Sequence, residues 1–385
     1  MMKIAYLSAT NFADCDLPLL QELQKIADVT YILEVTERAK KRTLIDIKQL
    51  KQKGGLYPAT DYPELHHIGR YVDINKAYVL NLPGLKGYSL QNIMGYIRLL
   101  SFLKEQQIDI LHVTWPPRYT AFPLYCIRDR MIITMHDPLP HSSETDLMNL
   151  FHRKMAIRLI PNFILLNNSQ REEFISTYGI KPNHVFQSQL SIYRHLQDTR
   201  PQLPAIEPGY VLFIGSINTH KGIEYLCEAM QIIHKQHPDL HLVVAGSGKL
   251  YFDYLPYEEC GILTLINRYL SNEELVGFIT QARCVVCPYV DATQSGVVMS
   301  AFSLGVPVIV SNVGGLTEMV TDGHNGYVVP PRDSSSLAEA ISRLCFSPDI
   351  WQSMRQNIQR DFSVGPLSWN QIANNMVNIY NAILS

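Results

Sequence analysis

The chain has 385 residues, of which 46% are hydrophobic and 18% charged, and its formal net charge is −2. This length exceeds what a single hydrophobic core usually serves, so we expect two domains. The near-neutral charge excludes proteins that hold nucleic acids by a large positive charge, and no nucleic-acid partner is predicted. No apolar run approaches the ~18–20 residues that cross a bilayer, and the N-terminal residues lack the features of a signal peptide; together these observations predict a cytoplasmic protein.

Short apolar runs alternate with longer helical patterns along the whole chain, which is typical of parallel α/β architecture. In the first half, the predicted strands are 3–8, 29–33, 110–113, 131–135 and 163–167. In the second half they are 210–214, 240–245, 263–266, 284–287, 306–310 and 326–329, with helical patterns at 222–237, 272–281 and 335–344. The sequence therefore predicts two doubly wound α/β domains in series.

The best candidate for a linker between these domains is 198–209. It contains three prolines and a glycine and has little periodicity. We therefore assign 1–197 to an N-terminal domain and 210–362 to a C-terminal domain. The last residues, 363–385, are expected to form a helix that packs back on the N-terminal domain.

Basic residues cluster between Arg38 and Lys53, where seven of them stand against one acidic residue, Asp46. Four apolar residues are interleaved at roughly helical spacing: Leu44, Ile45, Ile47 and Leu50. One interpretation is a solvated loop or helix face. The other is a patch that rests on anionic lipid headgroups, where each basic residue contributes ~1 kcal/mol.

The seven cysteines are scattered along the chain. Cys284 and Cys287 form a C-x-x-C pair, but no second pair or histidine cluster stands at zinc spacing, so no metal site is predicted. We expect reduced thiols packed in a strand, since free cysteine is among the most buried residue types. Asp14 and Asp16 superficially resemble a metal-binding pair, yet Asp16, before a Leu-Pro pair, is more simply a helix N-cap.

Glycines follow two of the predicted strands in the second half. Gly215 ends the strand 210–214, Lys221-Gly222 opens the next helix, and Gly246 follows the strand 240–245. Ligands of doubly wound domains bind beyond the carboxyl ends of the strands, where a lysine can reach a diphosphate. The alternatives are a surface cation at Lys221 and a tight turn at Gly246.

A longer motif begins after the strand 284–287. The segment Asp291-Ala-Thr-Gln-Ser295-Gly296 precedes an apolar helix that starts near Val297. Free backbone N–H groups at a helix start, with a serine beside them, form a ready anion site. The following strand and loop return Gly314-Gly315 and Glu318 to the same edge of the sheet.

On these residues, 210–344 resembles the donor domain of family-four retaining glycosyltransferases with the GT-B fold, and a weaker resemblance covers the whole chain. Members carry a strand followed by Gly-Arg, Lys-Gly opening a helix, two glutamates separated by seven residues, Ala-x-x-x-Gly-x-Pro-Val, and Gly-Gly with Glu. The matching positions here are Gly215, Lys221, Gly222, Ala301, Gly305, Pro307, Val308, Gly314, Gly315 and Glu318. The resemblance implies two Rossmann-like domains facing each other across a cleft. The Ala-Thr-Gln-Ser-Gly segment resembles a subset associated with bacterial surface polysaccharides.

The chain departs from the family pattern at two positions. Ser216 stands where the family has an arginine against the diphosphate, and Ser300 stands where it has the second glutamate. The first glutamate aligns with Ala292, next to Asp291. A serine still forms hydrogen bonds, but a neutral bond is worth roughly half of a charge-assisted one.

A histidine follows one strand of the first half. The family often has a histidine there that contacts the transferred sugar, so the resemblance assigns this role to His136. The alternative is a histidine whose hydrogen bonds are satisfied by its neighbour Asp137.

The resemblance implies transfer of a sugar from a nucleoside diphosphate sugar to an acceptor hydroxyl, with retention at the anomeric carbon and without a further cofactor or metal. The implied catalytic residues are His136, Lys221 and Asp291, and the implied donor-binding residues are Gly215, Ser216, Lys221, Gly246, Ser295, Gly296, Val297, Ser300, Gly314, Gly315 and Glu318. The expected acceptor is a saccharide or lipid-linked saccharide in polysaccharide or glycolipid biosynthesis, with peripheral contact at the inner face of the membrane. Two alternatives stay open: a catalytically silent GT-B binding or scaffold protein, and another GT-B enzyme such as a sugar-nucleotide epimerase.

Overall fold

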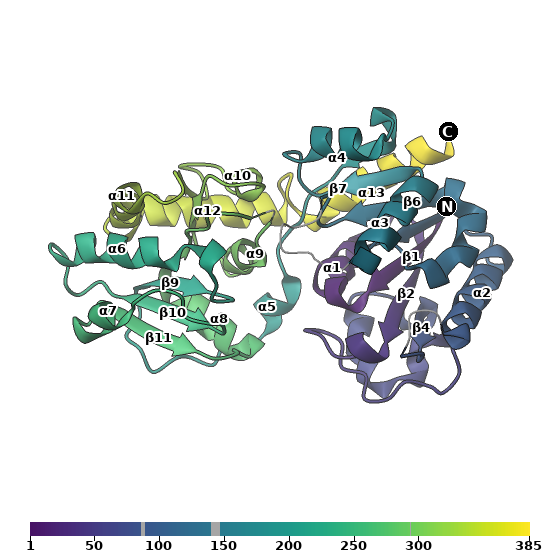
Figure 1. Cartoon of the computed structure of the whole chain (residues 1–385), viewed down its shortest axis with the longest axis horizontal. Helices are drawn as coiled ribbons and strands as arrows, with labels where there is room; N and C mark the ends of the chain where they lie inside the picture. Colours follow the sequence, from purple (N-terminus) through teal and green to yellow (C-terminus); the bar gives the residue numbers. More distant parts are fainter. Residues whose placement is uncertain (86–88, 140–146, 293) are drawn as a thin grey trace. The chain divides into compact units, whose positions relative to one another are not determined.

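The structure is a computed structural model that describes residues 1–85, 89–139, 147–292 and 294–385. The chain folds into two compact units, which Figure 1 shows with the chain coloured along its sequence. Unit 1 contains Met1–Leu190 together with Pro366–Ser385, and unit 2 contains Ser191–Gly365. The chain therefore passes between the units at 190–191 and again at 365–366, and the stretch 198–209, predicted as the linker, lies inside unit 2.

Unit 1 is built on an eight-stranded sheet in the order β3-β4-β2-β1-β5-β6-β7-β8. The strands are β1 (Lys3–Ala9), β2 (Asp28–Thr36), β3 (Gly55–Pro58), β4 (Ala77–Leu82), β5 (Ile110–Val113), β6 (Met131–Met135), β7 (Asn162–Leu165) and β8 (Val185–Gln187). Only the edge strand β3 runs antiparallel to its neighbour, β4. Because β1 pairs with both β2 and β5, the order of the strands reverses between β1 and β5, which is the topological switch point of this sheet.

The α-helices of unit 1 are α1 (Ala13–Leu23), α2 (Leu90–Glu105), α3 (Leu147–Leu159), α4 (Arg171–Tyr178) and α13 (Trp369–Leu384). Segments of 3-10 helix lie in the connections between strands and helices or between two strands: η1 (Thr10–Phe12), η2 (Glu37–Ala39), η3 (Ala59–Asp61), η4 (Pro63–Arg70), η5 (Ile74–Lys76), η6 (Tyr119–Arg130) and η7 (Pro182–His184).

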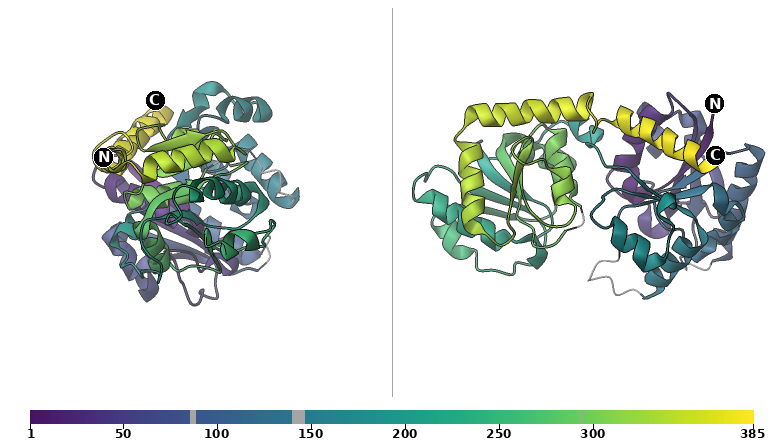
Figure 2. Two further views of the ribbon diagram at one scale, coloured as in Figure 1. Left: turned by 90° about the vertical axis from the view of Figure 1, so that its left-hand side faces the viewer. Right: turned by 90° about the horizontal axis from the view of Figure 1, so that it is seen from above.

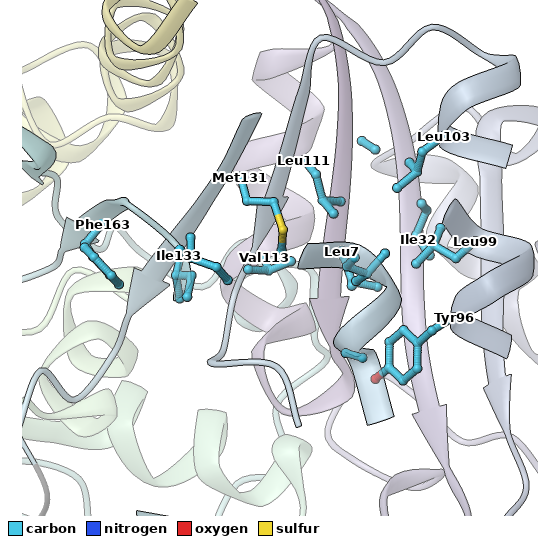
Figure 3. Packing of buried hydrophobic residues seen from close by; sticks show 14 of the residues in the cluster. Leu7, Ile32, Tyr96, Leu99, Leu103, Leu111, Val113, Met131, Ile133 and Phe163 are labelled. Carbon is cyan, nitrogen blue, oxygen red and sulfur yellow. The ribbon is translucent and has the colours of Figure 1, made fainter. Parts of the chain in front are cut away.

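Side chains along β1 alternate between the two faces of the sheet. Leu7 belongs to the buried cluster that also contains Ile32 of β2 and Tyr96 of α2, all labelled in Figure 3. Tyr6 points to the opposite face, where its hydroxyl donates to Asp16 of α1 at 2.9 Å. Helices therefore cover both faces of the sheet.

The C-terminal helix α13 packs against α1 and belongs to unit 1, and Figure 2 shows it in yellow. Its Tyr380 hydroxyl shares a hydrogen bond of 2.6 Å with Nδ1 of the buried His112 on β5. Nε2 of the same histidine lies 2.7 Å from Thr134 Oγ1 on β6. The last helix of the chain thus completes the core of the first unit.

Unit 2 contains a fully parallel six-stranded sheet in the order β11-β10-β9-β12-β13-β14. The strands are β9 (Tyr210–Ile214), β10 (Leu242–Gly246), β11 (Leu263–Asn267), β12 (Ala282–Cys287), β13 (Val308–Ser311) and β14 (Gly326–Val329). The helices are α5 (Arg194–Asp198), α6 (Ile223–His234), α7 (Leu255–Glu259), α8 (Asn272–Gln281), α9 (Gly296–Ser303), α10 (Leu316–Met319), α11 (Ser334–Cys345) and α12 (Pro348–Ser363), with the turn η8 (Thr219–Lys221). The switch point of this sheet lies between β9 and β12.

The predicted two-sheet α/β fold is confirmed, and β5, β6, β9 and β14 have the predicted bounds. The predictions do not include β3, β4 and β8. Strand β3 has Gly and Pro at its ends, and β8 has only three residues. Strand β4 follows a stretch of 3-10 segments, so it does not stand at the regular distance from β2 that an alternation of strands and helices would give. Cys284 and Cys287 are free, buried thiols of β12, as predicted.

The predicted N-cap role of Asp16 is wrong. Helix α1 begins at Ala13, so Asp16 lies inside the helix. Its carboxylate accepts hydrogen bonds from Tyr6 at 2.9 Å and from Ser8 at 2.5 Å. Asp16 therefore serves the buried contact between α1 and β1.

The basic segment from Arg38 to Lys53 does not present an apolar face to solvent. Ile45 and Ile47 are fully buried, and Leu50 is 8% exposed. Three of the lysines form ion pairs: Lys40 with Glu37, Lys41 with Asp46, and Lys51 with Asp61. Ile45, Ile47 and Leu50 are therefore not available to insert into a membrane, and the hypothesis that the basic residues of this segment rest on anionic lipid headgroups stays a prediction. Among the helices of the described ranges, none is long and apolar enough to cross a bilayer.

Candidate functional site

The loops that follow β9, β10 and β12 meet at one edge of the unit 2 sheet. The amide of Val290, after β12, donates to the carbonyl of His220, in the loop after β9, at 3.0 Å. Gly215, at the end of β9, donates its amide to Ala245 of β10 at 3.0 Å. Carboxyl ends of parallel strands share one edge, and this edge contains the switch point between β9 and β12.

Two glycines allow these loops to approach so closely. A Cβ atom on Gly246 would lie 1.8 Å from the carbonyl oxygen of Gly215, and one on Gly222 would lie 2.1 Å from that of Pro288. Both glycines also have positive φ, +150° and +61° respectively. The contact between loops therefore requires glycine at both positions, whatever binds beside them.

Lys221 is held directly at this switch point. Its Nζ lies 3.6 Å from the centroid of the Tyr289 ring, in the loop after β12. The side chain is partly buried, and this burial lowers the pKa of Lys221, although the nearby Cys287 thiol acts in the opposite direction. Within the described ranges, no carboxylate lies at ion-pair distance from its ammonium group. Lys221 is thus a positioned cation whose charge is available to a ligand.

Helix α9 begins beside this lysine. Ser295 is its N-cap, but the Ser295 hydroxyl does not cap the helix and instead lies 3.3 Å from the Tyr289 hydroxyl. Gly296 is exposed and Val297 partly exposed, so the first amides of the helix lie at an accessible end. Ser300 directs its hydroxyl to the Gly296 carbonyl at 2.9 Å, within its own helix.

The other predicted donor-binding residues lie on the same loops. Ser216 is exposed after β9 and accepts a hydrogen bond from the Asn218 side chain at 3.2 Å. Asp291 is exposed after β12, and Thr293 of the same motif lies outside the described residues. After β13, Gly314 has a φ of +47°, Gly315 is the N-cap of α10, and the exposed Glu318 lies on that helix. The structure thus brings this set together as loops of neighbouring strands.

His136, predicted to be catalytic, lies in unit 1 directly after β6. The ring of Phe12 stacks on its imidazole at 3.7 Å and 9°. Its Nε2 is buried and has no hydrogen-bond partner in the part of the chain that the structure describes. Burial lowers the pKa of His136 to about 4, so the imidazole is neutral at pH 7.

A second site, which the sequence interpretation missed, is a cavity of about 480 Å³ in unit 1. Its lining comes from the ends of β1, β2 and β5 and from α3, and includes Glu34, Trp115, Arg118 and Arg153. The signal available in the sequence was Trp115-Pro-Pro-Arg118, an aromatic and a cation just after the predicted strand 110–113.

Comparison with known proteins finds similarity that centres on unit 2. Residues 208–346 match the family "Glycosyl transferases group 1". An uncharacterized glycosyltransferase of Methanocaldococcus jannaschii is 33% identical over 174 residues, which is 44% of each chain. D-inositol 3-phosphate glycosyltransferase of Paenarthrobacter aurescens is 26% identical over 320 residues, covering 74% of this chain and 71% of that one. The matched segment thus spans less than half of the archaeal relative.

The crystal structure of the Anabaena protein HepE in complex with UDP resembles the whole chain, with a TM-score of 0.65 at 14% identity over 99% of this chain and 100% of that one. This similarity shows the GT-B fold of two α/β units. The family match covers β9 to α11, where all the predicted donor-binding residues lie.

Proposed function

We propose that the protein is a retaining glycosyltransferase that moves a sugar from a nucleoside diphosphate sugar to an acceptor hydroxyl. The observation that carries this proposal is Lys221, held over Tyr289 at the switch point and beside the start of α9. The group 1 glycosyltransferase match over the same residues supports it.

The chemistry follows from the charge that develops during transfer. As the glycosidic bond breaks, negative charge grows on the departing diphosphate while the sugar becomes oxocarbenium-like. A fixed cation and aligned helix amides stabilise such charge without reorganising when the reaction occurs. Lys221 and the first amides of α9 would act on the diphosphate, and Gly314, Gly315 and Glu318 would position the sugar hydroxyls. We propose that this positive charge, supplied by the chain itself, suffices for donor binding without a divalent ion.

Ser216 and Ser300 stand where the family pattern has charged donor-binding residues. Ser216 lacks the charge of an arginine, and Ser300 already donates its proton to Gly296, which leaves its oxygen only as an acceptor for a ribose hydroxyl. Weaker donor binding than in relatives with the charged residues is therefore expected. The competing proposal is a silent protein that binds nucleotide sugars without transferring them.

Incubation with UDP-sugars and candidate acceptors, followed by measurement of UDP release, separates these functions. Acceptor-dependent release of UDP supports a transferase. A changed sugar still attached to UDP would instead identify an epimerase. Binding of the donor without release or conversion would support the silent protein. Repeating the titration of the donor with a chelator tests metal independence, and loss of donor binding would contradict it.

We further propose a polysaccharide or glycolipid precursor as the acceptor class, with contact to an anionic membrane through α3. Met148 and Phe151 are 62% and 57% exposed on this helix, and Lys154 and Arg158 are exposed within two turns of Phe151. Flotation with anionic liposomes at low salt should recover the wild-type protein, and Lys154→Glu with Arg158→Glu should abolish flotation. Reversing the charge of the exposed Lys235, on unit 2, is the control; equal flotation with neutral lipids would contradict the proposal.

A further inference from the structure

Tyr289 connects two groups of unit 2 that carry positive charge. It is the second residue after β12, and its side chain is only 1% exposed. Its ring lies against the ammonium group of Lys221, with Nζ 3.6 Å from the ring centroid. Its hydroxyl lies 3.3 Å from that of Ser295, the residue that precedes α9. A side chain so deeply buried has no free surface for a ligand, so any effect on a ligand passes through these two neighbours.

The serine before α9 does not behave like other serines that precede helices of this chain. Ser89, Ser271 and Ser368 each accept a hydrogen bond from an amide in the first turn of α2, α8 and α13, at 3.2 to 3.5 Å. Ser295 has the extended backbone of such a cap, with φ −139° and ψ 110°. Its hydroxyl nevertheless accepts from none of the amides of α9, all of which the structure describes. A residue well suited to cap α9 is therefore engaged elsewhere.

Tyr289 supplies the stronger of two contacts that engage this serine. The other is the Cys287 thiol, whose Sγ lies 4.0 Å from Ser295 Oγ, and a thiol is a weak hydrogen-bonding group. Burial raises the pKa of the Tyr289 hydroxyl well above its ordinary value, so this hydroxyl stays protonated and neutral at pH 7. Ser295 is itself 5% exposed, and a buried hydroxyl that loses its partner is costly. The contact with Tyr289 thus holds the serine hydroxyl away from the helix.

The consequence concerns the first amides of α9. These amides have no acceptor within their own helix, and a serine cap would occupy one of them. An anion that binds there would then first have to displace the cap. Because the cap is not made, the amides of the exposed Gly296 and the partly exposed Val297 keep their full capacity to donate to a ligand.

We propose that Tyr289 is a positioning residue for the donor diphosphate. Its hydroxyl keeps Ser295 from capping α9, and its ring holds Lys221 beside the same helix start. The inference rests on the proposed function, because it takes the diphosphate as the anion at this place.

The first test is Tyr289→Phe, which keeps the ring under Lys221 and removes only the hydroxyl. Ser295 is then free to cap α9, and UDP must compete with that cap. Calorimetric titration should show UDP binding weakened by about fivefold, which corresponds to the energy of one serine cap. Uridine has no phosphate, so its affinity should not change. Unchanged UDP affinity, or equal weakening of UDP and uridine binding, would overturn the inference.

A second measurement needs no ligand. A serine cap accepts from the second or third amide of a helix, which here belongs to Val297 or Val298. One of these amides should exchange its hydrogen several times more slowly in ligand-free Tyr289→Phe than in the wild type. No UDP binding by the wild type would reject the proposed function itself. UDP binding by the wild type, together with unchanged exchange in the variant, would reject only the role of Tyr289.

A rescue separates positioning from a merely structural role. Adding Ser295→Ala to Tyr289→Phe removes the hydroxyl that would cap α9, so UDP affinity should return to within about twofold of the wild type. If Tyr289 only supports the packing of this loop, the double variant will bind UDP no better than Tyr289→Phe, and the inference fails.

The matched control is Tyr210→Phe. Tyr210 is also buried in unit 2, and its hydroxyl donates to the carbonyl of Phe278 at 2.8 Å, away from α9. This change should lower the free energy of unfolding but leave UDP affinity and the exchange of the α9 amides as they are. An equal loss of UDP affinity in this control would show that the effect of Tyr289→Phe is a general loss of stability, and would overturn the inference.

Discussion

Lys221→Ala should weaken the binding of UDP by roughly ten- to a hundredfold. A phosphate oxygen placed about 4 Å from the Nζ would gain about 4 kcal/mol at the effective dielectric constant of a protein surface. Lys221 is only partly buried, so solvent reduces this value toward the ~1.5–3 kcal/mol typical of hydrogen bonds to charged groups. Uridine has no phosphate, and its binding should therefore change by less than about threefold.

Calorimetric titration of UDP and uridine into wild-type protein, Lys221→Ala and Lys235→Ala measures this difference. Lys235 follows the last residue of α6, the helix that Lys221 precedes, so its variant removes the same charge at the far end of the helix. Loss of the cation–π contact with Tyr289 will also lower the stability of the variant by about 0.5–1 kcal/mol, which thermal unfolding without ligand reveals. Equal weakening of UDP and uridine binding, or an equal effect of Lys235→Ala, would refute the placement of the diphosphate beside Lys221.

Three further changes test the geometry of the two units. Gly246→Ala should lower the free energy of unfolding by roughly 3 kcal/mol or more, because the new Cβ would clash with the backbone of Gly215. Gly261 also has positive φ but open space around it, so Gly261→Ala should lower the free energy of unfolding by only about 1 kcal/mol. Similar losses for the two variants in urea unfolding would contradict this prediction. Ser216→Arg should tighten UDP binding in calorimetry, and unchanged or weaker binding would show that this loop does not face the diphosphate. The pKa of His136 is about 4 in the folded protein, below the ordinary value of 6.5. Between these two pH values the unfolded chain binds a proton that the folded protein does not, so the free energy of unfolding decreases as the pH falls from 6.5 to 4. Asparagine does not titrate, so the free energy of unfolding of His136→Asn should decrease by on the order of 3 kcal/mol less than that of the wild type over this pH range. The same pH profile of urea unfolding for both proteins would contradict this prediction.

The sequence sufficed for the fold because most strands are continuous apolar runs. Strands buried on both faces, such as β5 and β9, have no solvent-exposed position along their length, so their bounds are easy to predict. The motif residues around Lys221 and Gly296 were also predictable, since each directly follows a strand or opens a helix. Side-chain contacts between elements were not predictable. Asp16 has the sequence context of a cap, and only its hydrogen bonds from Tyr6 and Ser8 of β1 identify it as a buried residue.

The unit 1 cavity was hidden for a related reason. Glu34 on β2, Trp115 in the loop after β5 and Arg153 on α3 lie far apart in the sequence. Only the strand order, which sets β1 between β2 and β5, brings them around one volume. Sequence patterns therefore predict a site whose residues lie in one loop. They do not predict a site whose residues lie far apart in the sequence and are brought together only by the order of the strands.

The return of α13 to unit 1 has a consequence for the order in which the protein folds. During translation, residues 191–365 emerge as one continuous stretch that already contains every strand of unit 2. Unit 1 begins to emerge first, but Tyr380, the hydrogen-bond partner of the buried His112, is synthesised only after all of unit 2. The N-terminal unit is thus the later of the two to reach its complete fold, and until then the buried His112 lacks its hydrogen-bond partner on α13.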